Sequence, residues 1–496
     1  MRRLLAAAAI CTLTAAATAR AATPQDAAEP YGLLSATGNL LPGNTLAERT
    51  ANYRKLYDAG VRAIRLDLSW TAVEPPGPPL HDYDFSGVDR EVQAITGAGL
   101  KVIGLLDYGH PDYSAAGGTV ARTPLAGGLP PFSVGNDSYY PPDDPADFGA
   151  FARAVAAHFA PAGDVVGWEI WNEENEGWRF WAPHEDPAAY ARLLCAAEDA
   201  IKLVDARTPV AFGGVFYPAI ADLPGMSGPD FVKAAYRSDP ALGRCFDAMA
   251  YHPYPYPFTA PELDDPIRGS VLAAADGMRA AMPRTDRSKP LWITEIGWPT
   301  HDRTYGVPEQ KQAQYIARTA LASFAQGIPV VNFYTYGDYD DPTGANQEAW
   351  FGFFRADGTP KPSYTALRTF SDTFRGAAFD RDLSRALHLP RGGLMTGGRG
   401  FALRYRRGTT WITAVWLANE SAAEGQGHMP PGGTLPPATI GVRVPVRSGA
   451  ATVVDYLGGL QTVDARHGAI RLTAGPGPQY VIDAAPPPTT RATAGR

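Results

Sequence analysis

Short apolar runs rich in β-branched residues alternate with helical patterns along most of the chain, from Tyr31 to about Arg375. Strands that alternate with helices form right-handed βαβ units around a parallel sheet. Eight such units predict a closed (β/α)8 barrel over residues 31–375. An open doubly wound sheet is disfavoured because no glycine-rich phosphate loop follows the first run. The predicted strands are residues 32–36, 62–68, 101–107, 165–171, 209–213, 247–251, 290–294 and 329–334.

The pattern changes after about residue 380, where short runs follow one another between Gly/Pro turns without helices. It predicts a C-terminal antiparallel β-sandwich over residues 380–484. Tyr405 and Trp416 look exposed there, and we expect them to brace the barrel rather than bind sugar. The Pro-, Thr- and Arg-rich tail, residues 485–496, is predicted to be disordered. The predicted strands are residues 401–406, 411–417, 441–446, 451–456, 469–472 and 479–482.

The start of the chain has the pattern of an export signal. Two arginines precede an apolar run, residues 4–13, that is too short to span a bilayer. Small residues at positions 19 and 21 fit a cleavage site. We therefore expect residues 1–21 to be a signal peptide and the protein to be secreted. No later apolar run is long enough to cross a membrane.

Signal cleavage would leave two cysteines, Cys195 and Cys245. In an oxidising compartment they either form a disulfide or stay as buried thiols, and the sequence favours neither. Their surroundings lack the Cys/His spacing of a zinc site.

Charge and aromatic content narrow the class of partner. The formal net charge of −7 argues against nucleic acid or an anionic membrane. Aromatic residues make up 11% of the chain, and aromatic rings stack on the apolar faces of sugars. Most of these rings are expected in the core, so the composition permits a sugar partner without proving one.

Two strand ends carry carboxylates that suit one chemistry. The fourth predicted strand leads into Asn172 and Glu173, and the seventh leads into Glu295. Active sites of such barrels lie at the C-terminal ends of the strands, and strands four and seven face each other. Retaining glycosidases place two carboxyl groups about 5–5.5 Å apart, as nucleophile and acid/base. This chemistry needs no metal and no organic cofactor, and we expect neither.

The motifs around these glutamates resemble a known family. The run Trp168-Glu169-Ile170-Trp171-Asn172-Glu173, the later Phe180-Trp181 and Thr294-Glu295-Ile296-Gly297-Trp298 are similar to the clan of (β/α)8 glycoside hydrolases with catalytic glutamates on strands four and seven. Within the clan, the chain most resembles glycoside hydrolase family 39. The resemblance covers the barrel and, more loosely, the terminal sandwich. Family members often have Glu-Pro-Asn where this chain has Glu173-Glu174-Asn175.

The resemblance implies a role for each matching residue. Glu173 would be the acid/base and Glu295 the nucleophile, while Asn172 would bind the sugar 2-hydroxyl. Arg65 and Tyr254 would orient the nucleophile, and His252 would line the same subsite. Trp298 and Tyr334 complete the predicted substrate-binding set.

Neighbouring residues are expected to tune or to surround this site. Trp171 and Trp178 are expected to shield Glu173 and raise its pKa, and Arg65 to keep Glu295 ionised. Glu169 is interpreted as structural, Glu174 and Glu176 as loop residues, and Arg65 has Asp67 as an alternative partner. Asp107, Tyr108 and His110 are weaker candidates for binding sugar hydroxyls. Two loops, about residues 109–143 and 174–187, are expected to shape the cleft.

Together these features predict a secreted retaining glycoside hydrolase acting on an oligo- or polysaccharide. β-Xylosides, other pentosides and hexose-containing exopolysaccharides are the candidate substrates. A transglycosylase on the same scaffold and a non-catalytic carbohydrate-binding protein are the alternative interpretations.

Overall fold

The computed structural model describes residues 23–30, 32–38, 41–114, 139–177, 179–218, 225–255, 258–262, 270–301, 306–341, 346–394, 399–418 and 439–484. The predicted signal peptide, most of the predicted cleft loop 109–143, Trp178 and the predicted disordered tail lie outside these residues.

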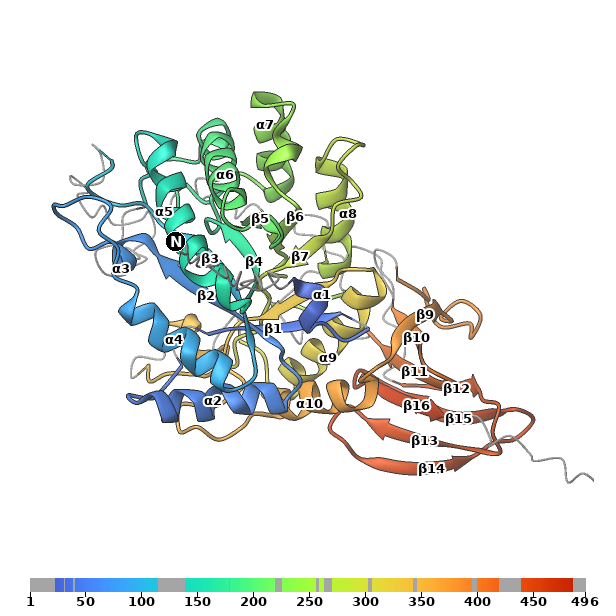
Figure 1. Cartoon of the computed structure of the whole chain (residues 1–496). Coiled ribbons are helices and arrows are strands. Elements are labelled where there is room, and N and C mark those ends of the chain that lie inside the picture. Colours follow the sequence, from blue (N-terminus) through green and yellow to red (C-terminus); the bar gives the residue numbers. More distant parts are fainter. Residues whose placement is uncertain are drawn as a thin grey trace, which may run out of the picture.

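Eight parallel strands close into a barrel in sequence order, so the predicted fold class is confirmed (Figure 1). Closure occurs between the first and last strands, where Ser35 pairs with Asn332. The strands are β1 (Leu33–Thr37), β2 (Ala63–Ser69), β3 (Lys101–Asp107), β4 (Val165–Ile170), β5 (Val210–Phe216), β6 (Ala248–His252), β7 (Leu291–Ile293) and β8 (Val330–Phe333).

Helices surround the barrel, and side-chain caps fix where several of them begin. Thr45 and Glu48 form a capping box at α2, and Asp144 and Asp186 cap α5 and α6. Among the described residues no helix combines the length and apolarity needed to span a bilayer. The helices are α1 (Pro24–Ala27), α2 (Leu46–Asp58), α3 (Trp70–Val73), α4 (Ser86–Gly97), α5 (Pro145–Phe159), η2 (Ala160–Ala162), α6 (Pro187–Lys202), α7 (Gly228–Ser238), η3 (Leu242–Cys245), α8 (Val271–Ala281), α9 (Glu309–Ala325), η4 (Gln347–Trp350) and α10 (Pro362–Phe374).

The barrel interior changes from apolar to polar along its axis. The early residues of all eight strands supply an apolar cluster that includes Leu33, Ile103 and Trp292. Further along the strands, buried polar side chains such as Arg65 and Glu169 face one another. The apolar end is the packed base of the barrel, and the polar end prepares a site at the C-terminal ends of the strands.

The C-terminal region is an antiparallel β-sandwich. A six-stranded sheet in the order β14-β13-β16-β11-β10-β9 faces a two-stranded sheet of β12 and β15. Side chains of both sheets, including Val415, Val442 and Ile470, share one apolar cluster. The strands are β9 (Ala378–Asp382), β10 (Gly400–Arg407), β11 (Thr410–Leu417), β12 (Ile440–Pro445), β13 (Ala450–Asp455), β14 (Leu460–Asp464), β15 (Ala469–Ala474) and β16 (Gln479–Asp483).

Two of these strands, β9 and β14, were not predicted. Both are edge strands, and most of their side chains are exposed. Edge strands without a buried face lack the apolar alternation by which strands are recognised in a sequence.

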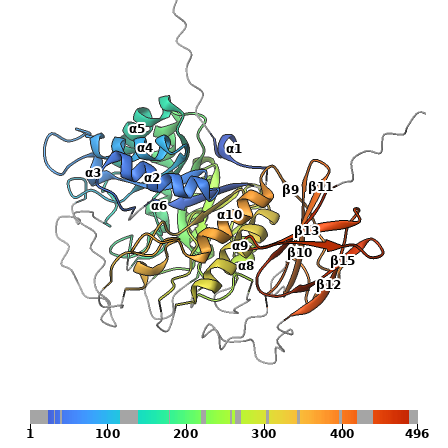
Figure 2. The same ribbon diagram turned by 90° about the horizontal axis from the view of Figure 1, so that it is seen from below.

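The sandwich packs on α9 and α10 at one side of the barrel (Figures 1 and 2). Tyr405 is fully buried, and its hydroxyl donates to the Leu321 carbonyl of α9 at 2.7 Å. Trp416 is also fully buried, and its indole N–H donates to Glu262, which pairs with Arg318 of α9. The expectation that these aromatics are exposed was therefore wrong, whereas their bracing role is confirmed.

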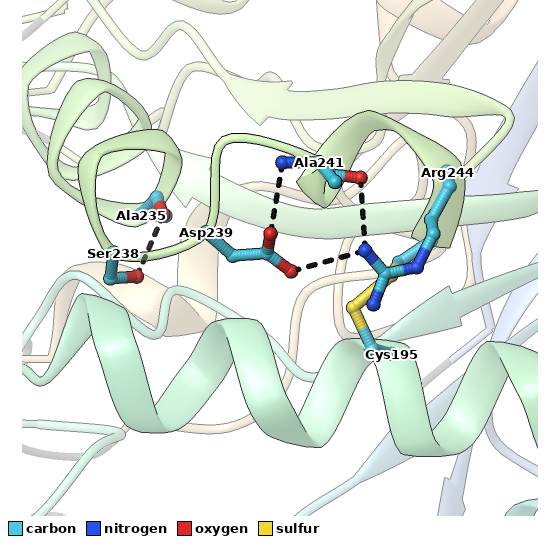
Figure 3. The surroundings of a disulfide bond; sticks show 7 residues. Cys195, Ala235, Ser238, Asp239, Ala241 and Arg244 are labelled. Carbon is cyan, nitrogen blue, oxygen red and sulfur yellow. Dashed lines mark hydrogen bonds and ion pairs between the residues drawn. A yellow bond between two sulfur atoms is a disulfide. The ribbon is translucent and has the colours of Figure 1, made fainter.

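A disulfide joins Cys195 of α6 to Cys245 of η3 and closes a sequence separation of 50 residues. It fastens the segment after α7 to the outer face of α6 (Figure 3). The same segment is held by Asp239, which accepts from the Ala241 backbone N–H and from the Arg244 guanidinium.

Replacing both Cys195 and Cys245 by serine should lower the free energy of unfolding by about 4 kcal/mol, because the unfolded chain regains the entropy of a 50-residue loop. Urea denaturation followed by circular dichroism measures the change. Reducing the wild-type protein should destabilise it by a similar amount. A change below about 1 kcal/mol in both measurements would show that the crosslink contributes little.

Candidate active site

Glu173, His252 and Glu295 lie together at the C-terminal ends of β4, β6 and β7. One carboxylate oxygen of each glutamate and one ring nitrogen of His252 lie within 4.8 Å of one another. Glu173 is 3% exposed, whereas the Glu295 side chain is 14% exposed. The barrel thus brings the two predicted glutamates face to face.

The chain leaves β4 in an unusual backbone conformation. The strand ends at Ile170, and Trp171 and Glu173 then adopt φ values of 69° and 48°. Non-glycine residues in this left-handed region cost about 1–3 kcal/mol each and cluster at functional sites. Backbone hydrogen bonds from Trp171 to Leu106 and from Glu173 to Gly214 hold the conformation.

Glu295 receives two hydrogen bonds from residues predicted to orient it. Arg65 Nη1 donates to one carboxylate oxygen at 2.6 Å, and the Tyr254 hydroxyl donates to the other at 3.0 Å. Burial and the charge of Glu295 raise the pKa of Tyr254 well above its ordinary value, so Tyr254 keeps its proton. The two donors thus fix both carboxylate oxygens of Glu295.

Glu173 has different partners. His252 Nδ1 lies 2.9 Å from its Oε1, and Arg179 Nη1 lies 3.5 Å from its Oε2. Burial raises the pKa of Glu173, but Arg179 and His252 together outweigh burial, and the net pKa is lowered. This corrects the expectation that shielding by Trp171 raises the pKa, because a guanidinium lies beside the carboxylate.

Asn172 links this cluster to the neighbouring strand end. Its Oδ1 accepts from Arg65 Nη2 at 2.9 Å, and its Nδ2 donates to the Tyr108 hydroxyl at 3.1 Å. The Tyr108 ring stacks on Phe180 with 5.5 Å between ring centroids. Tyr108, a weak candidate from sequence, is therefore part of the site. His110 instead contacts the Glu74 carbonyl.

Glu169 lies inside the barrel below the two glutamates. Arg65 binds it with two nitrogens, at 2.8 and 3.0 Å, and the Thr294 hydroxyl donates to it at 3.0 Å. Arg65 therefore has Glu169, Asn172 and Glu295 as hydrogen-bonded partners, and the charge of Asp67 also acts on it.

Trp298 lies away from the cluster. Its indole is fully buried, donates to the Thr259 carbonyl at 2.9 Å and packs on Tyr315. This environment corresponds to packing rather than to sugar contact. The predicted Tyr334 is half-buried beside Phe351, and the charges of Glu348 and Glu295, with burial, raise its pKa.

The turn after Glu173 contains the residues that depart from the family motif. Glu174 and Glu176 are loop residues, as expected, but both are buried, and burial raises the pKa of Glu174 well above its ordinary value. Asn175 anchors the turn by exchanging two hydrogen bonds with the backbone of Phe216, both at 2.9 Å. The turn is thus fastened to β5.

Three residues near the site were missed in the sequence. Arg179 lies in the aromatic-rich segment after the turn, and Thr294 directly precedes Glu295. Glu348 lies in η4, and burial together with Glu295 and Glu173 raises its pKa. Only Thr294 had a usable signal, because it adjoins a predicted catalytic residue at a strand end.

The donor atoms of Glu173, His252 and Glu295 are the one cluster of this kind in the described part of the chain that is compact enough to share a metal ion. Arg65 and Arg179, however, place guanidinium groups 2.6 and 3.5 Å from its carboxylates. Two cations at these distances repel a metal ion, so the residues do not fit a metal site.

Solved structures similar to this chain share its fold. A family 39 glycoside hydrolase from Bacteroides cellulosilyticus has a TM-score of 0.64 and 21% identity, covering 92% of this chain and 81% of that one. The fold is shared with that family. A family 39 β-xylosidase from Caulobacter crescentus has a TM-score of 0.59 and 16% identity, with 94% and 98% covered. No protein-family model and no curated protein sequence matches the chain.

Replacing Arg179 by glutamine should raise the pKa of Glu173, because a cation that stabilises the carboxylate is removed. The 13C resonance of the Glu173 carboxyl group, assigned with Glu173→Gln, reports the titration. Arg179→Lys is the matched control, since it keeps the charge and should shift the titration less. An unchanged titration in Arg179→Gln would show that the guanidinium does not act on Glu173.

Proposed function

We propose that this protein hydrolyses glycosidic bonds with retention of configuration, using Glu295 as nucleophile and Glu173 as acid/base. The proposal rests on the carboxylates of Glu173 and Glu295, which have oxygen atoms within 4.8 Å of each other and have different hydrogen-bond partners. Retaining glycosidases hold their carboxyl groups about 5–5.5 Å apart, whereas inverting enzymes need about 6.5–9.5 Å to admit a water molecule. The spacing therefore favours retention.

The two steps follow from these positions. A Glu295 oxygen attacks the anomeric carbon, the bond to the leaving oxygen breaks, and that oxygen takes the proton of Glu173. Water then loses a proton to Glu173 and attacks the same carbon, which releases the sugar and restores Glu295. Arg65 and Tyr254 donate to Glu295 and hold its carboxylate in place for the first step.

Glu173 must hold a proton when the sugar is bound. In the free protein Arg179 and His252 favour its ionised form. The negative charge of Glu295 and the loss of water around a bound sugar both favour its protonated form. We infer that sugar binding shifts Glu173 toward the acid needed for the first step.

The substrate proposed is an oligo- or polysaccharide outside the cytoplasm. Pentosides are the leading candidates, because one of the similar structures is named a β-xylosidase. The signal-like N-terminal segment supports export. The Cys195–Cys245 disulfide also supports it, since disulfides persist mainly in oxidising compartments.

Glu295→Ala should abolish turnover of aryl glycosides, because no nucleophile remains. Glu173→Ala should slow substrates with poor leaving groups by about 10²–10⁴-fold and activated aryl glycosides much less, because an activated leaving group needs no proton. A panel of aryl pentosides and hexosides with leaving groups of graded pKa provides the measurement. Equal losses on all leaving groups would contradict the acid role of Glu173.

The first sugar released should have the same anomeric configuration as the substrate, since two displacements occur at one carbon. Proton NMR of the anomeric signal during the first minutes of turnover records it before mutarotation. Transfer to an added sugar in preference to water would instead indicate a transglycosylase. Binding of polysaccharide without any turnover would indicate a non-catalytic protein.

A further inference from the structure

A chain of buried hydrogen bonds runs through the barrel interior to Glu173. Arg65 binds Glu169 with two nitrogens, and the Thr294 hydroxyl donates to Glu169 Oε1 at 3.0 Å. The same hydroxyl lies 3.1 Å from His252 Nε2, and His252 Nδ1 lies 2.9 Å from Glu173 Oε1. His252, Thr294 and Glu169 are all fully buried.

The chemistry of the partners fixes which atom carries each proton. Glu169, paired with Arg65, is a carboxylate and accepts only, so the single proton of Thr294 points to it. The Thr294 oxygen must then accept from His252, which places a proton on Nε2. Neutral His252 consequently presents an unprotonated Nδ1 to Glu173. The other neutral tautomer of His252 would leave the contact between Nε2 and the Thr294 oxygen without a proton.

The neighbouring strand leaves room for this arrangement. A Cβ atom added to Gly214 of β5 would lie 2.1 Å from His252 Nε2 and 2.7 Å from Glu169 Oε1. Real Cβ atoms do not approach other atoms this closely, so only glycine at position 214 allows His252 and Glu169 to meet beside Thr294. The chain of hydrogen bonds thus depends on β4, β5, β6 and the end of β7.

We propose that Thr294 and Glu169 are positioning residues that fix a proton on Nε2 of His252 and thereby make the Glu173–His252 pair keep one proton between Nδ1 and Oε1, from which the leaving oxygen is protonated. If the proton between Glu173 Oε1 and His252 Nδ1 leaves, two lone pairs face each other at 2.9 Å. This state is unfavourable, so the proton is held to higher pH. The inference rests on the proposed function only for its kinetic consequence, because the position of the proton on His252 is independent of activity.

Other charged and titratable groups face the Glu173–His252 pair from each surrounding strand end. Arg179 opposes protonation of Glu173, whereas Glu295, 3.8 Å from His252 Nδ1, supports it. These groups stay in place when Thr294 is changed, so their effects cancel in a comparison of variants at that position. Within the described residues these groups are Arg65, Glu169, Glu174, Arg179, Glu295, Glu348, Tyr108 and Tyr254.

The test compares Thr294→Val with Thr294→Ser. Valine has the shape of threonine without the hydroxyl, so Nε2 loses its acceptor and neutral His252 is free to move its proton to Nδ1. Nδ1–H then donates to ionised Glu173 and stabilises it. We expect the basic limb of the pH profile of kcat/KM on a poor-leaving-group glycoside to move down by about one pH unit in Thr294→Val and to stay near wild type in Thr294→Ser.

15N NMR of histidine-labelled protein at high pH shows which ring nitrogen of His252 carries the proton. The His252 signals are assigned by comparison with His252→Gln. The expected result is an unprotonated Nδ1 in wild type and Thr294→Ser, and a protonated Nδ1 in Thr294→Val. Thr294→Ala provides the same loss of hydroxyl if the valine variant fails to fold. A protonated Nδ1 in neutral wild-type His252 would overturn the proposal. The NMR result stands even if no glycoside is turned over, so its failure is distinct from failure of the proposed function.

Discussion

The site depends on one buried cation, Arg65, in the middle of the barrel. Its guanidinium donates to Glu169 through two nitrogens, to Asn172 and to Glu295, and its side chain is 1% exposed. A buried charge is tolerated only when its partners replace water, and removing one partner typically costs about 3–5 kcal/mol. Arg65 therefore ties β2 to the ends of β4 and β7. These hydrogen bonds hold the ends of β4 and β7 together and thereby set the distance between Glu173 and Glu295.

The hydrogen bonds of Arg65 also account for the strained backbone after β4. Asn172 must point inward to Arg65 while Glu173 reaches across to His252, although successive residues of a strand face opposite sides. The left-handed conformations of Trp171 and Glu173 break the alternation and turn both side chains toward one centre. The cost is offset by backbone hydrogen bonds to β3 and β5. A regular strand could not place both groups in the site.

The sequence predicted the barrel strands and the meeting of Glu173 and Glu295 at their ends, because both depend on local patterns. Buried parallel strands are continuous apolar runs, and chemistry in this fold lies where they end. The burial of Trp298 could not be predicted, because an aromatic residue at a strand end has the same pattern whether it packs or binds sugar. Arg179 and the pKa of Glu173 were missed because they depend on how a loop folds back over the strand ends. Tertiary contacts of this kind leave no periodic signal.

Glu173 and Glu295 differ because opposing influences act on the pKa of Glu173. Glu295 accepts hydrogen bonds from Arg65 and from Tyr254, one at each carboxylate oxygen. Glu173 has a cation beside one oxygen and a histidine beside the other, and both oppose the effect of burial on its pKa. When a bound sugar excludes water, a carboxyl group whose pKa depends on opposing influences changes its protonation. A carboxyl group that is held by hydrogen-bond donors alone does not. In the proposed mechanism two chemically identical side chains thus take different roles, because a bound substrate shifts the environment of Glu173 and leaves the hydrogen bonds of Glu295 in place.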